Sequence, residues 1–352
     1  MAVKSSTTSK PGNSLQAAPR PVDARGRPLR DLRISVMDRC NFRCPYCMPE
    51  DTYHEAFRFL HRDERLTFDE IVRLAQLFVG LGVNKIRITG GEPLLRPNLA
   101  ELVGELTGLD EVDVALTSNG ILLAQHAAAL AAAGLQRVTV SLDAIDEPTF
   151  TTMTGGRGGL QRVLDGISAA IEAGLTPVKI NAVVERGVND HAVIELVERF
   201  RGTGVIVRFI EYMDVGNINH WQRRDMVPSA ELLARIAEHW SLSPVDPNYH
   251  GEVARRYRFD DGAGEIGFIS SVTAPFCGDC TRARLSSDGK LYTCLFASTG
   301  LDLRTPLREG ASDTELLELV RHCWIARTDR YSEQRAQKPA GKDKVEMFYI
   351  GG

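Results

Sequence analysis

The feature that most constrains this chain is a group of three cysteines, Cys40, Cys44 and Cys47, spaced C-x3-C-x2-C directly after the first apolar run. A structural zinc site is closed by four ligands, and iron–sulfur clusters held entirely by cysteine also use four. The nearest candidates for a fourth ligand are His54 and His61, and both lie in a polar, charged segment where a solvated side chain is expected. The trio therefore predicts a metal centre with one coordination position left open for chemistry.

The composition is that of an enzyme-sized globular chain. Its 352 residues are 43% hydrophobic and 25% charged, and the formal net charge is −4, which argues against general binding to nucleic acid or to anionic membranes. Six of the seven cysteines fall in two tight groups, a pattern that favours metal ligation in a reducing compartment over disulfides. With no run of eighteen apolar residues and no apolar segment behind the first ten residues, we expect a cytoplasmic protein without a membrane span.

Strand-length apolar runs alternate with segments of helical period. Six βα-type steps are predicted, and repeated steps of this kind imply a parallel sheet. Regular alternation favours a barrel or partial barrel, although the order of elements alone does not exclude a doubly wound sheet. The expected strands are 32–36, 85–89, 112–117, 137–142, 178–184 and 205–211, and the expected helices are 67–81, 98–106, 122–133, 160–173 and 191–200, with later helices over 228–240 and 313–326.

The chain divides into three parts. Residues 1–24 are rich in Ser, Thr, Pro, Gly and Ala and are expected to be a disordered tail. Residues 25–216 carry the βα alternation, and residues 217–352 form a region where that rhythm is lost.

Motifs follow the predicted strands at the end where parallel barrels place their chemistry. Gly90-Gly91-Glu92 follows the second strand, and two glycines allow close approach of backbone to a ligand. Thr117-Ser118-Asn119-Gly120, Ser141-Leu142-Asp143 and Glu211-Tyr212-Met213-Asp214 follow the third, fourth and sixth strands, and each alone is compatible with a simple turn.

A second group of three cysteines, Cys277, Cys280 and Cys294, lies in the C-terminal region. A structural zinc site is one interpretation, although its second half-site is incomplete; a second cluster with an open iron that binds a substrate atom is the other. Arg282 and Arg284 between these cysteines would share one face of an extended segment, and paired guanidiniums suit phosphate oxygens. Further cations at strand positions predict a buried anion such as a triphosphate: these are Arg33, Arg87, Lys179 and Arg208.

The motif C-N-F-R-C-P-Y-C together with G-G-E resembles the signature of the radical S-adenosylmethionine (SAM) superfamily. From about residue 25 to 352 the chain resembles the GTP 3′,8-cyclase family of molybdenum cofactor biosynthesis. This narrower resemblance rests on the further motifs F-C-G-D-C-T-R-A-R and R-F-I-E-Y-M-D-V-G and on the terminal Gly351-Gly352. The resemblance implies an α/β fold, a partial (βα)6 TIM-type barrel with a C-terminal extension that carries a second iron–sulfur cluster.

The resemblance also implies roles for individual residues. Two [4Fe–4S] clusters would be held by Cys40, Cys44 and Cys47 and by Cys277, Cys280 and Cys294. The contacts with SAM would be Tyr46, Gly91, Ser141 and Met213. The contacts with GTP would be Arg33, Arg87, Thr117, Lys179, Arg282 and Arg284, with Ser118 as an alternative to Thr117. The C-terminal Gly351 and Gly352 would reach into the pocket.

The reaction implied is that of a lyase. A 5′-deoxyadenosyl radical from SAM takes the ribose C3′ hydrogen of GTP, C3′ attacks C8 of guanine, and an electron and a proton complete (8S)-3′,8-cyclo-7,8-dihydroguanosine 5′-triphosphate. Implied partners are an electron donor, the downstream cyclic pyranopterin monophosphate synthase and a second copy of the chain in a homodimer. Another radical SAM enzyme with an auxiliary cluster, acting on a peptide or a tetrapyrrole, is the alternative, and a zinc-containing binding module is the non-enzymatic one.

Overall fold

A computed structural model of the chain describes residues 20–335 and 343–351. Its centre is a set of six parallel strands that pair in sequence order, as the βα alternation predicts. The strands are β1 (Asp31–Ser35), β2 (Lys85–Thr89), β3 (Asp113–Ser118), β4 (Arg137–Ser141), β5 (Lys179–Val184) and β6 (Ile206–Glu211).

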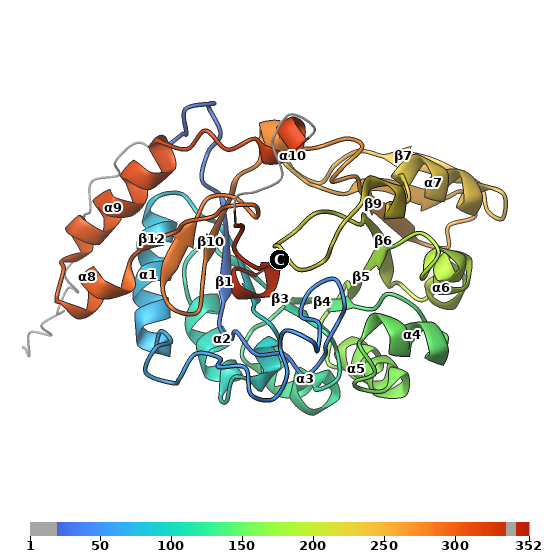
Figure 1. The fold of residues 1–352 in the computed structure, drawn as a ribbon, viewed down its shortest axis with the longest axis horizontal. Helices are drawn as coiled ribbons and strands as arrows, with labels where there is room; N and C mark the ends of the chain where they lie inside the picture. Colours follow the sequence, from blue (N-terminus) through green and yellow to red (C-terminus); the bar gives the residue numbers. More distant parts are fainter. Residues whose placement is uncertain (1–19, 336–342, 352) are drawn as a thin grey trace, which may run out of the picture.

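Strands from the C-terminal region extend this sheet at both edges. β9 (Glu265–Ile269) pairs in parallel with β6, and β10 (Arg282–Leu285) pairs in parallel with β1. Antiparallel strands complete the edges: β7 (Leu242–Val245) and β8 (Arg255–Phe259) on one side, β11 (Lys290–Tyr292) and β12 (Leu301–Asp302) on the other. The order runs from β12 to β7 without returning, so the described residues form an open, curved sheet, in agreement with the predicted partial barrel (Figure 1).

Most helices cover the outside of the curve, whereas the short C-terminal turn at Met347–Tyr349 lies inside it (Figure 1). The helices are α1 (Phe68–Gly80), α2 (Leu99–Thr107), α3 (Leu123–Ala132), α4 (Glu147–Met153), α5 (Leu160–Glu172), α6 (Val193–Phe200), α7 (Ser229–Ala237), α8 (Arg304–Arg308), α9 (Asp313–Ile325) and α10 (Tyr331–Gln334), with 3-10 turns η1 (Pro93–Leu95), η2 (Asp190–Ala192), η3 (Arg223–Asp225), η4 (Cys277–Asp279) and η6 (Met347–Tyr349). The capping box expected at Thr67 and Glu70 opens α1. Among the described residues, no helix has the length and apolar character needed to cross a bilayer.

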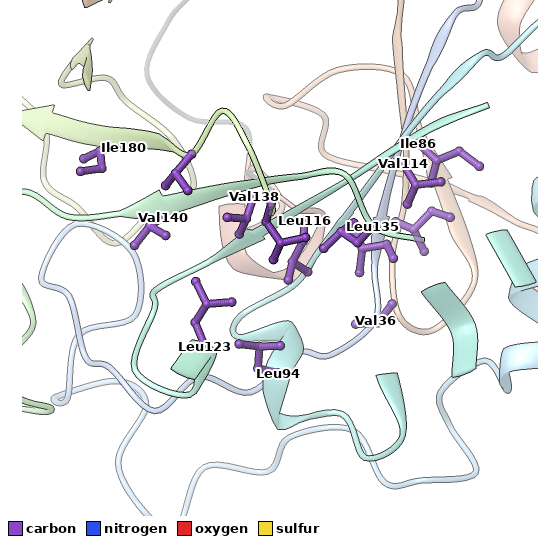
Figure 2. Packing of buried hydrophobic residues seen from close by; sticks show 14 of the residues in the cluster. Val36, Ile86, Leu94, Val114, Leu116, Leu123, Leu135, Val138, Val140 and Ile180 are labelled. Carbon is purple, nitrogen blue, oxygen red and sulfur yellow. The ribbon is translucent and has the colours of Figure 1, made fainter. Parts of the chain in front are cut away.

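Side-chain alternation along the parallel strands separates two environments. In β2, Ile86 and Ile88 point toward the helices and are fully buried, whereas Lys85 and Arg87 point to the inside of the curve. Figure 2 shows the apolar side of β2 to β5 packed with Leu94 and Leu123. Each such buried side chain contributes roughly 1.5–3 kcal/mol, so the outer layer stabilises the sheet and leaves its inner face free for polar groups.

Ordered structure begins before the predicted boundary at residue 25. Asp23 is 4% exposed, and its carboxylate pairs with Arg27 at 2.6 Å and with Arg327 at 3.3 Å, which fixes this segment against the C-terminal region. The rest of the predicted tail, residues 1–19, lies outside the described residues. The predicted division at residue 216 stays a prediction, since the sheet runs continuously across it.

Candidate functional site

The first cysteine group faces a cavity at the C-terminal ends of the parallel strands. Cys40, Cys44 and Cys47 all line it, and the cavity thus brings together residues that are far apart in the sequence. Of the predicted SAM contacts it includes Tyr46, Gly91 and Ser141. Met213 lies beyond the end of β6, where its carbonyl accepts from Asn219 Nδ2 at 2.9 Å, and is not part of the described lining. Its contact with SAM stays a prediction.

The Gly-Gly-Glu loop is held against the cysteine loop by backbone hydrogen bonds. Gly91 N donates to Met37 O, and Glu92 N donates to Arg39 O, both at 2.7 Å. A Cβ atom on Gly91 would lie 2.3 Å from Arg39 O, so only glycine permits this approach. The glycine is therefore needed to bring the end of β2 beside Cys40.

The Glu92 carboxylate ties two strand ends together. It accepts from Ser118 Oγ at 2.9 Å, from Asn119 N at 2.8 Å and from Leu94 N at 3.0 Å. Burial raises the pKa of Glu92 to about 7, against the effect of these three donors. Asn119 in turn directs its Nδ2 at Cys40 Sγ, 3.7 Å away, so this network positions a predicted cluster ligand.

Asp143 is a cavity residue that the sequence interpretation left as part of a turn. Its carboxylate accepts from Tyr46 Oη and from Val183 N, both at 2.8 Å, and burial raises its pKa to about 6. The position two residues after Ser141, at a strand end, was the only sequence signal for it. Tyr46 is thereby oriented beside Cys44 and Cys47.

A row of cations lies on the inner face of the sheet. The registers pair Arg284 with Arg33 and Arg33 with Arg87, so these three side chains stand side by side on β10, β1 and β2. The row continues to Arg208, whose Nη2 lies 3.3 Å from Thr139 Oγ1, and to Lys179, paired with Thr139. The strands thus gather the predicted cations on one surface.

The electrostatics of this row indicate a site for an anion. Burial, followed by repulsion from neighbouring guanidiniums, lowers the pKa of Arg33. The same two effects lower the pKa of Lys179 to about 8, the pKa of Arg208 to about 9 and the pKa of Arg284 to about 10. Mutual repulsion among partly buried cations is unfavourable unless a polyanion binds between them.

Thr117 joins the cavity to the cation row. It lines the cavity, and its Oγ1 accepts from Arg87 Nη1 at 3.0 Å. Ser118 is 3% exposed and its hydroxyl donates to Glu92. Ser118 lines the same cavity, so the choice between Thr117 and Ser118 as the ligand contact stays a prediction.

The second cysteine group surrounds the start of β10. Cys277 opens η4, Cys280 follows it, and Arg282 Nη2 and Arg327 Nη2 lie 3.3 Å and 3.1 Å from Cys280 Sγ. Burial opposes ionisation of Cys280, but the two guanidiniums outweigh it and lower the pKa to about 6. Burial raises the pKa of Cys294 to about 11.

The C-terminal tail enters the same interior. Met347 and Phe348 line the first cavity, and Gly351 O accepts hydrogen bonds from Arg33 Nη1 at 3.4 Å and from Arg284 Nη1. Figure 1 marks the C-terminus inside the curve of the sheet. Gly351 has a φ of +70°, and a Cβ there would lie 2.2 Å from Thr89 Cγ2. Gly352 lies outside the described residues.

The arrangement of the first cysteine group fits an iron–sulfur cluster, whereas the cluster predicted at the second group stays a prediction. Within residues 20–335 and 343–351, no three His, Cys, Asp or Glu side chains converge as ligands of one ion would. A four-iron cluster is larger than an ion, and its three thiolates can surround it while facing one space, as the first group does. His54 and His61 are exposed, as expected for histidines that are not ligands. Cys323 lies on α9 and is half-buried.

Two family models match successive parts of the chain. The radical SAM superfamily model matches residues 34–200, and the model described as Molybdenum Cofactor Synthesis C matches residues 205–333. Curated relatives are similar over nearly the full length. The GTP 3′,8-cyclase of Xanthomonas campestris pv. campestris is 54% identical over 96% of this chain and 99% of its own, and that of Acidothermus cellulolyticus is 52% identical over 94% and 98%.

Solved structures share the fold at low sequence identity. Streptococcus suis SuiB bound to S-adenosylmethionine has a TM-score of 0.58 at 14% identity, covering 92% of this chain and 77% of that one. The anSMEcpe structure with bound AdoMet and Cp18Cys peptide has a TM-score of 0.53 at 14% identity, covering 91% and 93%. At this identity the likeness concerns the fold and leaves the substrate open.

Proposed function

The chain belongs to the GTP 3′,8-cyclase family of radical SAM enzymes, and from this premise we propose how its residues convert GTP to (8S)-3′,8-cyclo-7,8-dihydroguanosine 5′-triphosphate in the first step of molybdenum cofactor biosynthesis. The observation that carries the proposal is the continuous inner surface from Cys40, Cys44 and Cys47 through Thr117 to the cation row and Cys280. The reaction is a lyase reaction, because a ring forms within one nucleotide without hydrolysis or group transfer.

The cavity end of this surface binds SAM. Cys40, Cys44 and Cys47 would hold a [4Fe–4S] cluster, which would supply the electron for cleavage of the carbon–sulfur bond of SAM. Gly91 presents backbone to the methionine part, and the hydrogen bond from Tyr46 to Asp143 fixes the aromatic ring at the wall. Ser141 and Met213 complete the proposed SAM contacts.

The cation end binds GTP. Arg33, Arg87, Lys179 and Arg284 meet the triphosphate, whose negative charge relieves their mutual repulsion. Cys277, Cys280 and Cys294 would hold a second [4Fe–4S] cluster that supplies an open iron for the base, and Arg282, whose Nη2 lies 3.3 Å from Cys280 Sγ, would bind the nucleotide beside it. Thr117 and the Gly351 carbonyl lie between the two ends.

This placement lets one substrate react with itself. With phosphates and base both fixed, the ribose C3′ hydrogen faces the SAM end and C3′ stays close to C8 of guanine, so orientation replaces a random encounter. One hydrogen atom moves from C3′ to the 5′ carbon of the adenosyl group, one C3′–C8 bond forms, and one electron and one proton complete the product.

We also propose the setting of the reaction. The enzyme works in the cytoplasm with an external electron donor, its product passes to cyclic pyranopterin monophosphate synthase, and the chain forms a homodimer. The full-length relatives favour this assignment over a radical SAM enzyme that acts on a peptide or a tetrapyrrole.

The decisive experiment uses GTP deuterated at C3′. Anaerobically reconstituted protein is incubated with reductant, SAM and the labelled GTP, and the released 5′-deoxyadenosine is analysed by mass spectrometry. Deuterium in 5′-deoxyadenosine is the expected result. Unlabelled 5′-deoxyadenosine would contradict hydrogen abstraction from C3′ while keeping the radical class, and its complete absence with intact clusters would contradict the class.

A further inference from the structure

The cysteine loop has a second, outer surface that the reaction does not use. Beside this loop lies an open hollow of about 630 Å³, lined by Arg39, Phe57, Phe59 and Arg65 among others. Cys40 lines both the cavity and the hollow. It is therefore part of the wall between the hollow and the proposed SAM cluster.

Three arginines and one carboxylate line this hollow: Arg39, Arg43, Arg65 and Glu55. Arg62 and Arg96 lie near Arg65, and we call Arg39, Arg62, Arg65 and Arg96 the arginine patch. In the part of the chain that the structure describes, none has a carboxylate oxygen within 4.0 Å. Burial and the charges of Arg39 and Arg62 lower the pKa of Arg65, whereas the charge of Asp38 opposes this shift. Burial and the charges of Arg65 and Arg62 also lower the pKa of Arg96. The four guanidiniums thus repel one another.

Two nearby carboxylates are engaged elsewhere, whereas Glu55 lines the hollow and the charge of Asp38 acts on Arg65. Asp63 lies 2.5 Å from His61 Nδ1, and Glu64 pairs with Arg58 at 3.7 Å. The patch arginines contact neutral groups instead, such as Met37 Sδ at 2.9 Å from Arg65 Nη1 and the Phe59 ring 5.6 Å from Arg39 Cζ. With three arginines against one carboxylate, the lining of the hollow is locally positive in a chain whose formal net charge is −4.

The hollow also offers an apolar contact surface. Phe57 is 37% exposed, and its ring packs edge-on against Phe59 at 4.8 Å between centroids. Phe59 and Phe57 both contact the ring of Tyr53, which packs in the small apolar cluster beside Cys40 and Cys47. Aromatic side chains surrounded by arginines are typical of protein docking surfaces.

We propose that the arginine patch and the Phe57–Phe59 pair form the docking surface for a small acidic electron-carrier protein, with Cys40 as the nearest part of the electron acceptor. This inference rests on the proposed function, which requires electrons from outside. The carrier loses one electron, the cluster bound by Cys40, Cys44 and Cys47 gains it, and no covalent bond forms between the proteins. Charge complementarity steers the encounter and sets its rate.

The test compares two reductants on reconstituted enzyme. Reduced flavodoxin, an acidic flavoprotein, serves as the protein donor, and dithionite serves as a small donor that needs no docking surface. The variants are Arg62→Glu, at an exposed position, and Arg39→Glu; Arg162→Glu, an exposed arginine on α5, is the matched control. Release of 5′-deoxyadenosine gives the rate, and a titration with oxidised flavodoxin gives the dissociation constant independently of turnover.

We expect each patch variant to lose about tenfold in rate with flavodoxin and to bind it correspondingly more weakly, with the rate under dithionite unchanged. The wild-type rate with flavodoxin should also fall with rising salt, and less so in the variants. Unchanged flavodoxin affinity in both variants, an equal loss in Arg162→Glu, or an equal loss with dithionite would each overturn the docking surface. Failure of wild type to release 5′-deoxyadenosine with dithionite would instead refute the proposed function, and the binding titration would still decide the docking.

Discussion

The two cysteine groups differ in the charges that surround them. In the first group, Asn119 and the amide of Phe42 face Cys40 Sγ, and burial followed by the charge of Glu92 raises the pKa of Cys40 to about 12, against the weaker effect of Arg43. In the second group, Cys280 Sγ lies against the guanidiniums of Arg282 and Arg327.

This difference suits two different tasks. Cationic groups in contact with the thiolates raise the reduction potential of an iron–sulfur cluster, so the two guanidiniums at Cys280 favour a higher potential in the second group than in the first. The first group is therefore suited to a strongly reducing cluster that donates an electron to SAM. The second group lies beside arginines that hold a polyanion, which suits a cluster whose task is to bind substrate.

The strongest test of this contrast removes one ligand from each group. Cys44→Ser should abolish release of 5′-deoxyadenosine, whereas Cys294→Ser should leave that release measurable and abolish the cyclised product. Chromatography of both products from the same reaction measures the two effects. Cys323→Ser, half-buried on α9, is the matched control and should retain both activities. Full cyclisation by Cys294→Ser would refute the substrate role of the second group.

A second test concerns the tail that passes between the groups. Deleting Gly351 and Gly352 should abolish cyclised product without unfolding, because Gly351 O no longer meets Arg33 and Arg284. Gly351→Ala should lose most activity too, since its φ of +70° and the contact with Thr89 Cγ2 both disfavour a side chain. Circular dichroism checks the fold, and Thr89→Ser, which removes the clashing methyl group, should restore part of the activity of Gly351→Ala. Normal turnover of the truncated chain would contradict the role of the tail.

A third test addresses the arginines of the second group. Arg282→Ala should weaken GTP binding about 10- to 100-fold, because hydrogen bonds to charged groups contribute about 1.5–3 kcal/mol. It should also shift the reduction potential of the second cluster downward and leave that of the first unchanged. Titration with GTP and spectroelectrochemistry measure the two effects, with Arg282→Lys as the charge-conserving control. Unchanged affinity would remove Arg282 from the proposed substrate site.

Local sequence patterns predicted the parallel half of the fold well. The strand over 85–89 and the capping box at Thr67 are confirmed, because alternation and end-capping are local properties of the chain. The strands β7 to β9 were missed, since short polar strands such as Arg255–Phe259 gain their stability from pairing with distant residues. α4 was missed for a similar reason: seven residues beginning Glu-Pro resemble a turn until the Asp146 cap is seen.

Site residues that belong to a sequence motif could be predicted. Residues that act by orienting another side chain could not. The cysteines and cations could be named from spacing and from charges within apolar strands. Asp143 acts by orienting Tyr46, and Asp214 acts by binding residues more than a hundred positions away, so neither function is visible locally. Such roles follow only from the tertiary contacts.

The smallest expected effect concerns Asp214, which links the first half of the chain to the tail. Its carboxylate accepts from Tyr331 Oη at 2.5 Å, from Arg335 Nε at 2.7 Å and from Lys344 Nζ at 2.9 Å. Burial opposes its ionisation, but Tyr331, Lys344 and Arg335 together hold the pKa of Asp214 below its ordinary value. Because the pKa is lowered in the folded chain, this contact stabilises the tail at neutral pH, and the contribution is lost as the pH falls through that lowered value.

Asp214→Asn should therefore loosen the tail while leaving both cysteine groups in place. A loss near 1 kcal/mol corresponds to about fivefold lower cyclisation at neutral pH, with faster hydrogen exchange in residues 343–351. The variant should also lose the acid-induced loosening of the wild-type tail, because asparagine carries no charge to titrate. Asp313→Asn, which breaks a surface pair with Arg73, is the matched control and should change neither readout. If Asp214→Asn lowered 5′-deoxyadenosine release as much as cyclisation, Asp214 would act on the SAM end through the adjacent Met213, and the tail would not be its point of action.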